Sequence, residues 1–163
     1  TPEDTLVNVL RYQIEHCDPN YGRAIVLSID DEHPEKAPAY DRLIQFHGNF
    51  SKFTINYDAI SGYYYALVCR VTQKAVLKQR NCLTLTRSKN LDDWEIVRDV
   101  LNFQDNGWKE GIEKVGFQYV DWIFDGDDIL FLSRTAINNA HNFHNANYMT
   151  FHRLANFRDY LDI

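Results

Sequence analysis

The sequence lacks the features that mark several common protein classes. None of its hydrophobic stretches approaches the ~18 residues of a membrane-spanning helix. Its seven glycines form no phosphate-binding loop, and its three cysteines (Cys17, Cys69 and Cys82) lack the spacing of a metal site. No signal-peptide pattern is present, and the chain starts with Thr-Pro rather than Met. We therefore expect a processed or truncated chain with no bound metal and no cofactor.

An excess of basic residues is also missing. The chain has 17 Lys and Arg against 23 Asp and Glu, a net charge of −6. Binding to phosphate backbones requires a basic face, so this balance argues against a nucleic-acid partner. Hydrophobic residues make up 45% of the 163 positions and aromatic residues 14%, which is enough for a sizeable core and excludes a disordered chain.

The apolar segments are short, rich in β-branched and aromatic residues, and bounded by turn-forming residues, which predicts strands. Ten such segments are found: 6–11, 24–30, 42–46, 52–57, 63–71, 82–87, 95–101, 117–124, 129–134 and 148–153. Residues 59–62 and 125–128 have the composition of tight hairpin turns. No segment shows a long 3.6-residue period. The sequence therefore predicts an all-β fold.

An internal repeat is the most informative pattern. Residues 81–94 align without gaps with residues 147–160, with identities at Asn81/Asn147, Thr84/Thr150, Arg87/Arg153, Asn90/Asn156 and Asp93/Asp159. Upstream, residues 65–70 match residues 129–134, which places Arg70 and Arg134 at equivalent positions. A weaker third copy begins with residues 6–11 and 24–30. Each unit therefore contains about four strands.

Four antiparallel strands repeated at this interval are typical of the blades of a β-propeller. Residues 1–46 would end one blade, 47–101 would form a complete blade, 102–116 would link two blades, and 117–163 would form most of another. The alternative is a β-sandwich built from a duplicated pair of hairpins. About two and a half blades cannot close a ring, so the propeller interpretation requires the remainder of the same propeller.

One turn carries a family resemblance. Residues 88–94 read Ser-Lys-Asn-Leu-Asp-Asp-Trp. They resemble the Ser-x-Asp-Leu-x-x-Trp turn of propeller glycosidases and, more loosely, the Asp-box (BNR repeat) of sialidases, with Asn90 in place of Asp. In such a turn a polar side chain caps backbone N–H groups and the Trp packs between the outer strands, so we expect a folding device rather than a catalytic one.

Together with residues 116–122 and 145–153, this turn makes the chain look like the C-terminal part of a sialidase-like propeller. The resemblance implies a propeller of five or six blades that acts on glycans. It also implies an extracytoplasmic location, secreted or periplasmic.

Propeller topology sorts the polar residues between two ends of the strands. Asp58, Asp92, Asp93, Asp125, Asp127 and Asp128 lie at predicted hairpins on the end that we call the far face. Arg11, Arg70 and Arg134 end the second strands of three units on the opposite end, the near face. Three convergent guanidinium groups would bind a carboxylate, as an arginine triad does in sialidases. Duplication alone is the alternative explanation of these positions.

The first strand of the last unit provides the catalytic candidates. On a regular strand Tyr119 and Asp121 share one face. A tyrosine nucleophile with a separate carboxylic acid is the sialidase variant of glycoside hydrolysis, so by resemblance Tyr119 would be the nucleophile and Asp121 an acid or positioning group. The alternative is an aromatic core strand with a buried, hydrogen-bonded Asp.

Further near-face residues are candidate ligands of sugar hydroxyl groups. Gln118 adjoins Tyr119, and His144 and Asn147 belong to a long polar loop, residues 136–147. Trp108 is an aromatic of the kind that stacks on sugar rings. The structural alternatives are that Trp108 packs over a blade edge and that the loop is ordered by Asn-based turns and internal hydrogen bonds. The loop 72–81 carries Lys74, Lys78 and Arg80, which we interpret as a solvated rim.

These observations predict a glycan-acting propeller, in the first instance a sialidase-like glycoside hydrolase that cleaves a terminal sugar, acidic if the arginines bind it. One alternative is a propeller that binds carbohydrate without catalysis. Another is a glycosidase that acts on neutral sugars through carboxylates, and a third is a structural or protein-binding propeller.

Overall fold

The computed structural model describes residues 5–13, 19–103 and 110–161, and its regular elements are ten strands and one short 3₁₀ helix. The strands are β1 (Leu6–Arg11), β2 (Arg23–Ile29), β3 (Ala39–Gln45), β4 (Ile55–Asp58), β5 (Tyr63–Cys69), β6 (Cys82–Ser88), β7 (Glu95–Asn102), β8 (Gly116–Asp125), β9 (Asp128–Ala136) and β10 (Tyr148–Leu154). The 3₁₀ helix η1 (Phe157–Leu161) follows β10. All ten predicted strands are present, so the predicted all-β class is confirmed.

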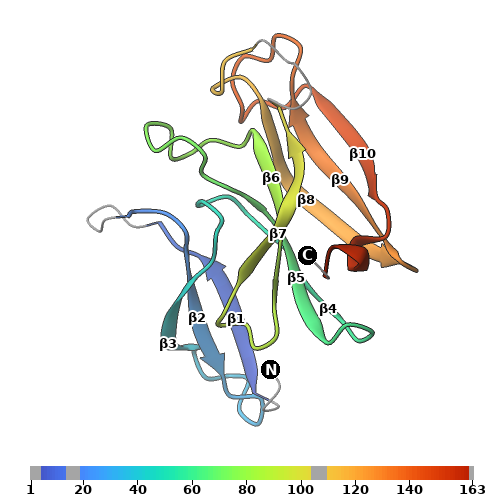
Figure 1. Ribbon diagram of the computed structural model, residues 1–163. Helices are drawn as coiled ribbons and strands as arrows, with labels where there is room; N and C mark the ends of the chain where they lie inside the picture. Colours follow the sequence, from blue (N-terminus) through green and yellow to red (C-terminus); the bar gives the residue numbers. More distant parts are fainter. Residues whose placement is uncertain (1–4, 14–18, 104–109, 162–163) are drawn as a thin grey trace.

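The strands form three antiparallel sheets that follow one another along the chain (Figure 1). Sheet I has the order β1-β2-β3, sheet II has the order β4-β5-β6-β7, and sheet III has the order β8-β9-β10. Each sheet is a simple meander in which consecutive strands are paired. The described residues contain no helix long and apolar enough to cross a membrane.

Sheet II lies between the other two sheets and is covered on both faces. Tyr65 and Leu67 of β5 belong to the core shared with sheet III, whereas Ala66 and Val68 belong to the core shared with sheet I. All four side chains are essentially inaccessible to solvent. This double burial explains why β5 is an almost continuous apolar run instead of an alternating one.

The β4–β5 and β8–β9 turns form where the sequence predicts tight hairpins, and local interactions stabilise them. In the β4–β5 turn the Asp58 carboxylate accepts hydrogen bonds from the backbone N–H groups of Ile60 and Ser61, and Gly62 takes a left-handed conformation (φ +70°). In the β8–β9 turn, where Asp125 pairs with Asp128, Gly126 has φ +60°. Glycine adopts this conformation without the steric cost that a Cβ atom imposes.

The turn at residues 88–94 is a folding device, as expected. Asn90 Oδ1 accepts hydrogen bonds from the backbone N–H groups of Asp92 and Asp93, both at 2.9 Å. The indole of Trp94 donates to the Leu91 carbonyl and packs edge-on against Phe46 in the core between sheets I and II. The amide of Asn90 therefore performs the capping that the Asp of the related motif would perform.

The pairing of strands corrects one step of the repeat alignment. Leu67 pairs with Leu85, and Leu132 pairs with Phe151. Since Leu85 and Phe151 correspond in the gapless repeat, Leu67 corresponds to Leu132 and not to Phe131. The alignment of residues 65–70 with 129–134 is therefore wrong by one residue.

This shift changes the relation between two of the arginines. Arg134 pairs with Met149, and Cys69 pairs with Leu83, the repeat partner of Met149. Arg134 thus takes the place of Cys69, and Arg70 and Arg134 do not occupy equivalent positions. A slip of one residue moves a side chain to the other face of a strand, so the two guanidinium groups leave their sheets in different directions.

The order of strands separates two ends of the molecule in the predicted way. The segments after β1, β3, β5, β7 and β9 lie on the near face, and the hairpins after β2, β4, β6 and β8 lie on the far face (Figure 1). The arginines at the ends of β1, β5 and β9 and the long 137–147 loop accordingly belong to the near face.

Candidate functional site: cations around Tyr119

The near face contains a strained residue at the start of β8. Tyr119 has φ +51°, a left-handed conformation that is costly for an aromatic residue. The strain arises from a β-bulge. Gln118 pairs with Arg134 and Asp121 pairs with Leu132, so Tyr119 and Val120 together lie opposite the single residue Ser133. The bulge turns the phenol of Tyr119 out of the sheet, where it is partly exposed.

Three cationic side chains surround the ring of Tyr119. The Lys52 Nζ lies 5.3 Å from the ring centroid, the Arg80 Cζ 5.4 Å and the Arg134 Cζ 5.1 Å. They come from three different segments: the β3–β4 link, the β5–β6 loop and β9. At these distances each cation is attracted by the quadrupole of the aromatic ring. We call these four residues the Tyr119 cluster.

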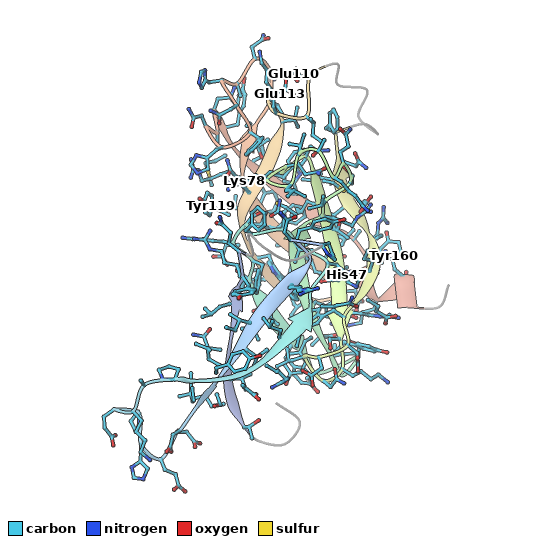
Figure 2. All side chains as sticks on the ribbon, turned by 90° about the vertical axis from the view of Figure 1, so that its left-hand side faces the viewer. His47, Lys78, Glu110, Glu113, Tyr119 and Tyr160 are labelled. Carbon is cyan, nitrogen blue, oxygen red and sulfur yellow. The ribbon has the colours of Figure 1, made fainter. Side chains whose placement is uncertain are left out.

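Within the described residues, no acidic side chain forms an ion pair with the cations of the Tyr119 cluster. None of the ion pairs found among the described residues includes Lys52, Arg80 or Arg134. Figure 2 shows Glu110 and Glu113 at the upper end of the molecule, well above Tyr119. The Glu110 carboxylate caps the backbone N–H of Asn139 at 2.6 Å. In a chain of net charge −6, this concentration of cations creates a local field that attracts anions.

Arg80 is held in place by the side chain of Gln118. Gln118 is fully buried; its side-chain oxygen accepts a hydrogen bond from Arg80 Nη1, and its amide donates to the carbonyl oxygens of Phe143 and His144, both at 2.8 Å. Among the described residues, the buried Nε of Arg80 finds no hydrogen-bond partner. Gln118, a predicted sugar ligand, therefore acts as a support that joins the Tyr119 cluster to the 137–147 loop.

His144 of the 137–147 loop lies beside the phenol of Tyr119. Its Nε2 lies 3.4 Å from the Tyr119 hydroxyl oxygen, and the two rings meet edge to face. Asn142 orders this part of the loop by accepting hydrogen bonds from the backbone N–H groups of His144 and Asn145. The structure thus brings the predicted residues Tyr119, His144 and Arg134 together.

Asn147 has a structural task. Its side chain accepts a hydrogen bond from the backbone N–H of Ile137 and donates one to the Ile137 carbonyl at 2.7 Å. Both ends of the loop are thereby joined. Asn147 and Asn142 therefore order the loop through turns and internal hydrogen bonds, which is the structural alternative to sugar binding given above.

The structure does not bring Arg70 to the Tyr119 cluster. Its guanidinium forms two hydrogen bonds to the Asp99 carboxylate, of 3.2 and 2.6 Å, in the adjacent part of sheet II. Burial opposes ionisation of Asp99, but the hydrogen bonds from Arg70 and Thr84 dominate and hold its pKa below the ordinary value. Arg11 donates a hydrogen bond to the carbonyl of Phe50. Of the three arginines predicted to converge, Arg134 lies beside Tyr119, whereas Arg70 and Arg11 bind other groups.

Asp121 is separated from the phenol by the bulge. Its carboxylate accepts a hydrogen bond from the backbone N–H of Trp122, and its side chain lines a hollow on the open face of sheet III with Ile123, Leu132 and Phe151. The regular alternation that would place Tyr119 and Asp121 on one face is broken between them. Trp108, the predicted stacking residue, lies outside the described residues.

Sequence reasoning missed two members of the Tyr119 cluster. The sequence predicts Lys52 within a strand, but β4 begins at Ile55 and Lys52 lies in the β3–β4 link. The sequence also places Arg80 with Lys74 and Lys78 in a solvated rim. The exposure of Lys74 and Lys78 agrees with that interpretation, whereas Arg80 is partly buried beside Gln118. The available signal was its position two residues before β6, where the backbone of Arg80 already forms a β-bridge with Gly116.

Comparison of the chain with protein-family models, with curated proteins and with solved structures finds no significant match. The function must therefore be argued from the Tyr119 cluster itself. Within the described residues, no group of three or more His, Cys, Asp and Glu side chains is arranged to hold a metal ion.

Proposed function

We propose that this chain is part of a β-propeller whose near face binds the anionic group of a sugar. The observation that carries this proposal is the cluster of Lys52, Arg80 and Arg134 around Tyr119, whose cations form no ion pair with an acid in the described part of the chain. Guanidinium groups donate planar, paired hydrogen bonds to carboxylates and sulfates, and an aromatic ring packs against the apolar face of a sugar. Both features are present within one site.

The stacking of the sheets supports the propeller part of the proposal. Sheet II packs one face on sheet I and the other on sheet III, as successive blades do. All near-face links stay on one side of this stack. Completion of a ring requires further sheets. The sialidase-like resemblance of the 88–94 turn supports an extracytoplasmic site of action.

Catalysis is the first form of this function. In a sialidase-like hydrolase, the Tyr119 oxygen would bond to the anomeric carbon of the bound sugar as the glycosidic C–O bond breaks, and His144, 3.4 Å from the hydroxyl, would accept the phenolic proton. The departing oxygen would take a proton from a separate acid, and water would then cleave the bond between the sugar and Tyr119. The hydroxyl is exposed and lies next to the cations that would hold the substrate anion.

Binding without catalysis is the second form, and a specific observation favours it. Hydrolysis needs an acid for the leaving group, and Asp121 lies beyond the bulge, against Ile123 and Leu132 instead of the phenol. A carbohydrate-binding propeller needs no such acid.

A glycan panel tests the proposal. The chain is screened for binding and for sugar release on glycans ending in sialic acid, uronic acid, sulfated sugar or neutral sugar, at low and high salt. We expect binding of acidic glycans that weakens with salt. Exclusive binding of neutral glycans, or no binding by a folded chain, would contradict the proposed anionic ligand. Release of sugar distinguishes the hydrolase from the binding module.

A further inference from the structure

The three sheets differ at one edge. In sheets II and III a first strand, β4 or β8, precedes the strand that leads to the near face, β5 or β9. In sheet I the strand that leads to the near face is β1, and it is itself the edge of the sheet. Within the described residues, β1 therefore lacks the neighbour that β5 and β9 have.

A groove lies along this edge, between sheets I and II. It has a volume of about 400 Å³ and is lined by Val7, Val9, Phe53, Ile55, Asn56, Tyr57, Tyr64 and Leu91. None of the lining residues carries a charge. Val7 and Val9 alternate along β1 with Leu6 and Leu10, which are 50% and 39% exposed on the opposite face of the strand. The groove side of the β1 edge is therefore uncharged and largely apolar, whereas on the opposite face Asn8 lies between the two leucines.

The equivalent place between sheets II and III is filled by a strand. There β4 and β8 touch directly: Asn56 Nδ2 donates to the Trp122 carbonyl at 3.1 Å, and Trp122 Nε1 donates to the Thr54 carbonyl at 3.2 Å. Val120 and Trp122 of β8 are buried in the shared core. The side of β4 that faces sheet I, with Ile55 and Tyr57, meets the groove instead of such a strand.

We propose that the β1 edge binds an extended peptide strand that runs antiparallel to β1, inserts apolar side chains into the groove and completes sheet I as β4 and β8 complete the other two sheets. An edge strand presents unpaired N–H and C=O groups to such a partner, and these supply hydrogen bonds. Alternate side chains of the strand enter the groove between Val9 and Ile55, while the others cover Leu6 and Leu10. The occupant is thus apolar on the side that enters the groove. This proposal is independent of any carbohydrate function.

A synthetic peptide with the sequence of β8, residues 116–125, with added lysines at both ends for solubility, tests the proposal. We expect it to bind the whole chain and to slow amide hydrogen exchange at residues 6–11. Val9→Lys places a charge in the groove and should weaken binding about tenfold or more. Ile123→Lys, an equal change at a 63% exposed position of sheet III, should leave binding unchanged.

Three results would overturn the proposal. The first is absence of binding by the folded wild-type chain. The second is equal binding by the Val9→Lys variant, which would mean that the peptide exchanges with β8 itself. The third is self-association of the chain without peptide, lost in Val9→Lys, which would make a second copy the occupant. Exchange protection at residues 6–11 of the wild-type chain decides the question even if Val9→Lys does not fold.

Discussion

Arg158 of η1 and Asp58 at the end of β4 form a bidentate ion pair across 100 positions of the sequence, with N–O distances of 2.7 Å in both arms. Both side chains are largely buried, at 14% and 4% exposure. Arg158 also donates to Asp127 at 2.8 Å, in the β8–β9 turn. One guanidinium therefore ties the far-face hairpins of sheets II and III together.

This ion pair makes stability depend on pH. The hydrogen bonds from Arg158 outweigh burial and lower the pKa of Asp58 from 3.8 to about 2. Since the folded-state pKa lies below the unfolded one, the stabilisation is fully present above about pH 4 and is lost as the pH falls through 2. Its full size is about 2 kcal/mol.

Asp58→Asn should therefore lower the free energy of unfolding in urea at pH 7 by about 2 kcal/mol. The difference from the wild type should shrink between about pH 4 and pH 2. Asp127→Asn is the matched control, because its carboxylate is 77% exposed and should contribute less than about 0.5 kcal/mol. An Asp58 effect that stays constant down to pH 2 would contradict this account.

Arg70 and Arg134 should respond in opposite ways to substitution. Arg70→Gln breaks the partly buried pair with Asp99 and should cost about 1–2 kcal/mol of stability without a change in glycan affinity. Arg134→Gln removes a cation beside Tyr119 and should weaken acidic-glycan binding about tenfold with little change in stability. Urea unfolding and binding titrations measure the two effects. Equal loss of affinity in both variants would contradict this prediction, because it would mean that Arg70 and Arg134 have equivalent roles in glycan binding.

The hydroxyl of Tyr119 separates binding from catalysis. Tyr119→Phe keeps the ring between Lys52, Arg80 and Arg134, so affinity for an acidic glycan should change less than about twofold. If the chain releases sugar, that release should be abolished in Tyr119→Phe because the nucleophile is gone. Lys74→Gln, a change at an exposed near-face residue, serves as the control. Unchanged sugar release in Tyr119→Phe would exclude the phenol as nucleophile.

The 88–94 turn should depend on its asparagine. Asn90→Ala leaves the N–H groups of Asp92 and Asp93 without their acceptor and should cost about 1 kcal/mol, measured by urea unfolding. Asn90→Asp keeps the acceptor oxygen and should retain most of the stability. Lys74→Ala, at an exposed position of the β5–β6 loop, should be neutral. A neutral Asn90→Ala would mean that the turn is held by Trp94 packing alone.

Local patterns predicted the elements of this fold well and the site only in part. Strand segments follow from β-branched and aromatic residues, and turns follow from residues such as Gly62 and Gly126, because both depend on near neighbours. The candidates His144 and Arg134 were found because loops and strand ends on one face converge. Arg70 was grouped with Arg134 because a repeat in sequence does not reveal a shift of one residue in strand pairing.

The sequence by itself determined the all-β class, the order of the ten strands and the division into a near and a far face, because these depend on alternation, turn chemistry and chain direction. Only the tertiary structure decided which cations meet Tyr119. That choice depends on the bulge at Tyr119 and Val120, on the buried anchor Gln118 and on the diversion of Arg70 to Asp99. Each of these is a contact between segments far apart in the chain, whose register no local pattern specifies.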